Sequence, residues 1–96
     1  MSVANEYVIG TDVTVEGTFR DTAGALIDPT LVKAWVISPS DVETEITPLQ
    51  NPTVGLYTGI VAADETGVWE YRFVGTGSVN VAGESRFTVQ RTKFVN

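Results

Sequence analysis

The chain has 96 residues, of which 43% are hydrophobic, and its 12 acidic against 6 basic residues give a formal net charge of -6. This length predicts a single domain with one modest core, over residues 1–90, followed by a tail at 91–96. Cysteine and histidine are both absent, which excludes disulfides, cysteine-ligated metals and the usual catalytic triads. The acidity argues against a nucleic-acid binder that relies on phosphate contacts.

The first third of the chain predicts two strands. Residues 6–9 form a short apolar stretch that we interpret as an edge strand. Val13, Val15, Gly17 and Phe19 then alternate with polar residues, which is typical of a strand with one buried face. We expect Gly17, on the buried row, to leave room for an aromatic ring opposite.

The middle of the chain alternates turns and strands. Turn signals at residues 21–24 and 28–30 flank Leu26 and Ile27, which we expect to close one end of the core. Residues 31–37 predict a strand that is apolar at nearly every position, and residues 42–47 a short strand with outward acids. Prolines at 48 and 52 should keep the next connection out of a central ladder.

The last third predicts a strand at 54–62, with Gly55 and Gly59 inside it, then a turn at 63–67. Trp69, Tyr71 and Phe73 follow at alternate positions, so three large rings share one face of a strand. Burial of these rings removes more apolar area from water than any other segment, so we expect the core to form around them.

The glycines at 75 and 77 predict a hairpin connection, and Gly83 suggests a bulge in the final strand, which ends near Gln90. About seven short strands at 8–12-residue spacing, with no helical period, predict an all-β antiparallel β-sandwich.

The aromatic strand resembles the corner region of immunoglobulin-like domains. Glu65, Gly67, Trp69 and Tyr71 follow the spacing of that region, with Trp69 in place of the corner tyrosine. The resemblance therefore implies an immunoglobulin-like sandwich in which the hydroxyl bond of the corner is absent.

A second resemblance covers most of the chain. The segments at 13–15, 19–21, 24–30, 55–57, 67–73, 75–77 and 86–89 look like those of small immunoglobulin-like proteins of tailed bacteriophages. This resemblance implies a non-enzymatic virion protein, assembled in the host cytoplasm in many symmetric copies. The expected role is a capsid decoration (cement) protein that binds the major capsid protein or other virion subunits. A head–tail junction or tail-associated component and a glycan-binding adhesive module are the alternatives.

The same resemblance orients the strand at 31–37. It implies that Val32, Ala34 and Val36 face the core, and that the outward row consists of Leu31, Lys33, Trp35 and Ile37. A tryptophan between branched apolar residues has the composition of an interface anchor. The alternative is that Trp35 lies under the aliphatic stem of Arg72 on the neighbouring strand.

Two further surfaces are candidates for partner binding. Leu56 and Ile60 form a second outward apolar pair, expected on the opposite sheet. In the tail, Arg91, Lys93 and Phe94 combine positive charge with an aromatic ring. This segment is expected either to fray or to add as a strand to a neighbouring subunit.

The acidic residues do not predict a catalytic or metal site. They fall at outward strand positions (Glu16, Glu43, Glu45, Glu70) or in turns (Asp21, Asp28, Asp41, Asp64, Glu65), and no pair of them occupies the buried position that general acid–base catalysis would require. Asp64 and Glu65 supply too few ligands for calcium, and an Asx-type bond to the turn is the simpler role for the acid there. We expect no cofactor, no metal, and neither a nucleic-acid nor a membrane partner.

Overall fold

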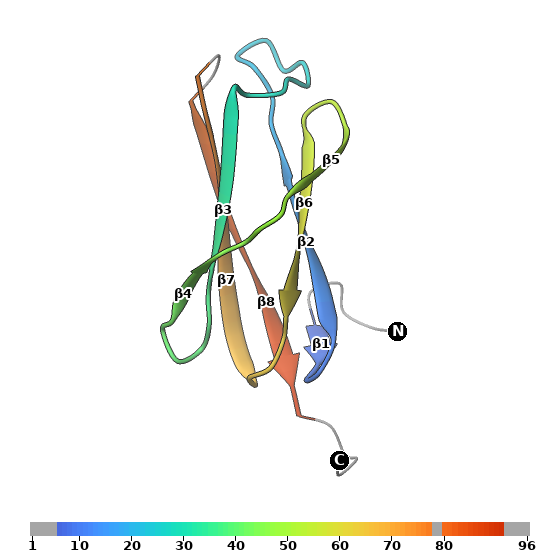
Figure 1. Ribbon diagram of the computed structural model, residues 1–96, viewed down its shortest axis with the longest axis vertical. Helices are drawn as coiled ribbons and strands as arrows, with labels where there is room; N and C mark the ends of the chain where they lie inside the picture. The colour runs from blue at the N-terminus through green and yellow to red at the C-terminus, as the bar shows by residue number, and fades with distance from the viewer. Residues whose placement is uncertain (1–5, 78–79, 92–96) are drawn as a thin grey trace.

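A computed structural model describes residues 6–77 and 80–91 of the chain as two packed β-sheets (Figure 1). Its strands are β1 (Glu6–Val8), β2 (Asp12–Thr18), β3 (Leu31–Ile37), β4 (Glu43–Glu45), β5 (Gln50–Thr53), β6 (Leu56–Ala62), β7 (Gly67–Thr76) and β8 (Val81–Gln90). The described part of the chain contains no helix that could cross a membrane. The all-β sandwich predicted from the sequence is confirmed.

The large sheet has the strand order β1-β8-β7-β3-β4, and the small sheet has the order β2-β6-β5. All the pairs are antiparallel except β1 and β8, which run parallel. The described residues form eight strands rather than about seven. The additional strand, β5, contains Pro52 and pairs with β6 alone, so the proline keeps it at an edge as expected.

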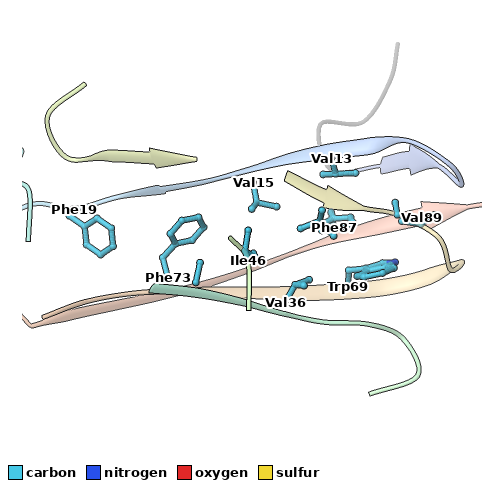
Figure 2. Packing of buried hydrophobic residues seen from close by; sticks show 12 residues of the cluster. Val13, Val15, Phe19, Val36, Ile46, Trp69, Phe73, Phe87 and Val89 are labelled. Atoms are coloured by element: carbon cyan, nitrogen blue, oxygen red, sulfur yellow. The ribbon is translucent and has the colours of Figure 1, made fainter. Parts of the chain in front are cut away.

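The core lies between the sheets and is built from alternate residues of the strands (Figure 2). Its buried side chains are Val13, Val15, Phe19, Ala34, Val36, Ile46, Val61, Ala63, Trp69, Phe73, Phe87 and Val89. Trp69 stacks on Phe87 with ring centroids 5.8 Å apart, and Tyr71 is half-buried against Phe73 and Phe87. The predicted core around the aromatic strand is thus confirmed, and β8 adds a fourth ring to it.

Gly17 has the role predicted for it. A Cβ atom at this position would lie 2.6 Å from Cγ of Phe73, which is closer than real Cβ atoms approach other atoms. The absence of a side chain on β2 therefore lets the Phe73 ring of β7 pack directly against the facing backbone.

Three local predictions are wrong. Gly55 does not lie inside a strand; it occupies the turn between β5 and β6, with a φ of 78° that favours glycine. Gly83 causes no bulge, because β7 and β8 stay in one register from Gly67↔Val89 to Gly75↔Val81. Leu26 does not close the end of the core, since it is 45% exposed.

The corner before β7 also differs from expectation. The indole Nε1–H of Trp69 donates a 3.0 Å hydrogen bond to the carbonyl oxygen of Glu65. A tyrosine hydroxyl is absent, but the tryptophan supplies an equivalent bond from a buried ring to the backbone upstream. Asx-type bonds occur instead in the earlier turn, where Asp21 accepts from the amides of Ala23 and Ala25.

Candidate interaction surfaces

The outer face of β3 presents the predicted row to solvent. Val32, Ala34 and Val36 face the core, so the orientation implied for this strand is confirmed. In the outward row Leu31 is 52% exposed, Lys33 is exposed, and Trp35 and Ile37 are half-buried. The structure therefore brings four of the predicted residues together on one face of the large sheet.

Trp35 stands between charged neighbours. In the ladder it lies opposite Arg72 of β7 on one side and Glu45 of β4 on the other. Arg72 in turn lies opposite Glu84 of β8, with 3.7 Å between Arg72 Nε and Glu84 Oε2. The predicted neighbour relation of Trp35 and Arg72 is present, and it leaves the indole only partly covered.

A shallow depression of about 180 Å³ opens beside this tryptophan. It is lined by Trp35, Ile37 and Tyr71 together with four charged residues, Glu43, Glu70, Arg72 and Glu84. Three carboxylates against one guanidinium make the surroundings of the indole acidic. An acidic, aromatic depression suits a cationic side chain, which gains both ion pairing and contact with the ring face.

The second predicted pair lies on the small sheet, as expected, on β6. Ile60 is 66% exposed and Leu56 is half-buried. Their cross-strand neighbours on β2 are Thr14 and Thr18, so the pair is not continuous with a larger apolar patch there. Ile60 instead borders an opening of about 320 Å³ between the sheets, together with Val42, which is 57% exposed.

The predicted tail residues are only partly described. Arg91 is exposed directly after the end of β8. Lys93 and Phe94 lie outside the described residues. Their predicted part in strand addition therefore stays a prediction.

The acids show no arrangement typical of a metal or catalytic centre. Within residues 6–77 and 80–91, no group of three or more acidic residues is placed to hold a metal ion. For Tyr57, partial burial and then the nearby Asp28 carboxylate raise the pKa above its usual value of 10.0. Asp28 also accepts hydrogen bonds from the Gly55 amide, at 2.7 Å, and from Asn51 Nδ2, at 3.3 Å. This cluster thus fastens a turn to a hairpin.

Sequence reasoning did not identify the acids beside Trp35 as part of that surface. The sequence predicts ordinary solvated positions for Glu43 and Glu70, whereas in the structure both flank Ile37 in the ladder. Glu84 reaches the same depression from β8. Strand alternation predicts that each acid points outward. Only the order β8-β7-β3-β4 in the large sheet places Glu43 on one side of β3 and Glu70 and Glu84 on the other.

Comparison with models of known protein families found no match, and comparison with curated proteins found none either. Among solved structures, the crystal structure of the Lin-41 filamin domain is similar, with a TM-score of 0.73 and 18% sequence identity. The match covers 96% of this chain and 89% of that one. The fold is an immunoglobulin-like β-sandwich. At this identity the likeness shows the fold alone.

Proposed function

We propose that this immunoglobulin-like domain is a non-enzymatic building block that attaches to a protein partner through the outer face around Trp35. The observation that carries the proposal is the combination of Leu31, Trp35 and Ile37 on one strand, all reachable from solvent. Scattered exposed apolar residues are ordinary, whereas a row of them on a flat sheet face has the composition of a docking surface.

The charges around the row indicate the chemistry of the partner. Glu43, Glu70 and Glu84 line the depression beside Trp35, and the chain as a whole carries a net charge of -6. A partner that offers a lysine or arginine to the depression, with apolar side chains beside it, would complement this face. Electrostatic attraction would speed the encounter, and the buried tryptophan would hold the complex.

The setting that we propose is a virion, with this domain as a capsid decoration protein on the major capsid protein. The support for this setting is the likeness of its turn and core segments to small immunoglobulin-like phage proteins. The immunoglobulin-like fold is compatible with it, and contact areas of about 1,600 Å² are typical of specific protein complexes. A position at the head–tail junction or in the tail would use the same docking face, with fewer copies of the domain in each particle.

The replacement Trp35→Ala tests the docking face. Because Trp35 lies outside the core, the variant should keep the wild-type circular dichroism and melting behaviour. Loss of a tryptophan anchor should weaken attachment by about 2 kcal/mol or more, which is roughly 30-fold in dissociation constant. Val54→Ala, in the turn between β5 and β6 where Val54 is 55% exposed, is the matched control.

The readout is co-sedimentation of labelled domain with purified particles, with the number of copies per major capsid protein measured at saturation. Hundreds of copies support decoration, and a dozen or fewer support a tail or vertex position. Unchanged attachment of the Trp35→Ala variant would refute the docking face. Quenching of tryptophan fluorescence by free sugars would instead support a glycan-binding module.

A further inference from the structure

The small sheet has a free edge along β2. In the sheet order β2-β6-β5, β2 has a neighbour on one side only among the described residues. The other edges are short or contain a proline: β1 and β4 have three residues each, and β5 contains Pro52. β2 has seven residues, which makes its edge the longest open one in the described part of the chain.

The hydrogen bonds to β6 show which backbone groups face this edge. Phe19 N–H donates to Gly55 O at 2.8 Å, and Thr11 O accepts from Ala63 N–H at 3.0 Å. In an antiparallel pair the direction of the backbone groups alternates, so the odd-numbered residues of β2 bond to β6. The amides and carbonyls of Asp12, Thr14, Glu16 and Thr18 therefore point to the open side.

An open depression of about 180 Å³ lies beside this edge, between the sheets. It is lined from β2 by residues 16–19, from β7 by Tyr71 and Phe73, and from β8 by Val81 and residues 83–85. Gly83 and Ser85 occupy the inward row of β8 together with Phe87 and Val89, yet both are exposed while the latter two are buried. This end of the sandwich thus has an inner face that nothing in the described residues covers.

Both glycines contribute to the depression. Gly17 lines the depression, and a side chain at this position would overlap the ring of Phe73. Gly83 is different, since a Cβ atom at this position would meet no atom within 4 Å. The floor of the depression carries aromatic and aliphatic groups, and its volume is similar to that of cavities of about 150 Å³ that accept one benzene ring.

We propose that this open edge accepts residues 91–96 from a second copy of the chain, as an added strand. In an extended segment, Arg91, Lys93 and Val95 fall on one face and Phe94 on the other. The basic face would lie beside Asp12 and Glu16, which are exposed on the outer face of β2. Phe94 would then enter the depression between the sheets, and backbone bonds to β2 would complete the edge.

The donor must be a second copy, because Phe94 of the same chain cannot reach the depression. β8 ends, and β2 begins, at the same end of the sandwich (Figure 1). Gly83 precedes Gln90 by seven positions in β8, which is about 24 Å at 3.4 Å per residue. Phe94 follows Gln90 by four positions and can reach about 14 Å at most, even fully extended. The contact therefore runs from the tail of one copy to the β2 edge of another.

Two variants of the full-length chain test the donor and the acceptor separately. Phe94→Ser removes the ring from the donor, and Gly83→Trp fills the acceptor from a position where a side chain has space. Ala82→Leu, on the outward row of β8, is the control for a bulky substitution in that strand. Near-ultraviolet circular dichroism and thermal unfolding of each variant check that it remains folded.

Sedimentation velocity over a range of concentrations gives the readout. The wild-type chain and the Ala82→Leu control should associate, whereas each of the two variants alone should associate about tenfold or more weakly. An equimolar mixture of the two variants should form heterodimers, since one retains the acceptor and the other the donor. Those pairs should not grow further.

A wild-type chain that stays monomeric at millimolar concentration would overturn the proposal. Association of Gly83→Trp or Phe94→Ser at wild-type strength would overturn it as well, as would a mixture that forms no heterodimers. The main alternative occupant of the β2 edge is the amino-terminal segment of the same chain, and removal of residues 1–5 tests it. If that deletion converts a monomeric wild type into an associating protein, the chain's own amino-terminal segment fills the edge, and the proposal is wrong. None of these residues belongs to the row on β3, so the result is distinct from the test of Trp35.

Discussion

Gly17 and Gly83 lie on strands that face each other, but their surroundings are opposite. At Gly17 the ring of Phe73 occupies the place where a side chain would be, whereas at Gly83 the space is open. Sequence alternation placed Gly17 on the buried row and predicted the close approach of a ring. For Gly83 the sequence predicts a bulge, but β7 and β8 pair in one continuous register and no bulge is present between them.

The replacement Gly17→Ala should lower the free energy of unfolding by about 1–3 kcal/mol, because the methyl group would overlap Phe73 in a closely packed core. Gly83→Ala, the matched control, should change it by about 0.5 kcal/mol or less. Urea unfolding followed by tryptophan fluorescence measures both. Equal stability of the two variants would show that the approach of Phe73 to β2 is loose.

At the scale of elements, the strand boundaries followed from the sequence wherever alternation or an apolar run was strong. The strand predicted at residues 31–37 has those bounds in the structure. β5 was not predicted, because Gln50–Thr53 has neither alternation nor apolar residues. It becomes a strand because β6 offers it an edge, and the Gly55 turn returns the chain alongside.

Asp28 connects two such elements. Its carboxylate accepts from the Gly55 amide at 2.7 Å and so joins the turn before β3 to the hairpin of β5 and β6. Loss of this bond leaves a partly buried amide without its acceptor.

The replacement Asp28→Ala should therefore lower the free energy of unfolding by about 1–2 kcal/mol and speed hydrogen exchange of the Gly55 amide. Asp28→Asn, which keeps an acceptor oxygen, should preserve most of the protection. Exchange measured by NMR distinguishes the two variants. Equally fast exchange of the Gly55 amide in wild type and Asp28→Ala would contradict this role.

At the scale of the whole molecule, the two proposed surfaces belong to different sheets. The row on β3 faces outward from the large sheet, and the acceptor edge is that of β2 in the small sheet. Stacked sheets lie about 10 Å apart, and substitutions separated by more than about 7–10 Å usually act independently. Substitutions on the β3 row and at the β2 edge should therefore have independent effects.

Trp35→Ala should thus weaken attachment to the partner without changing self-association, and Phe94→Ser should do the reverse. In the double variant each binding free energy should equal that of the corresponding single variant within about 0.5 kcal/mol. Rising salt should weaken both contacts, since each pairs acidic residues of this chain with basic groups. Co-sedimentation and sedimentation velocity on the same four proteins provide the comparison, and strong coupling would show that one surface serves both contacts.

The sequence by itself determined the class of fold, the alternation of each strong strand, and the aromatic strand that builds the core. These are local properties, because the direction of a side chain depends on its position in its own strand. Only the tertiary structure decided which acids line the depression beside Trp35, that the Trp69 indole completes the corner, and that β2 has an open edge. Those features depend on the order of strands in the sheets, and neighbours in a sheet come from segments far apart in the chain.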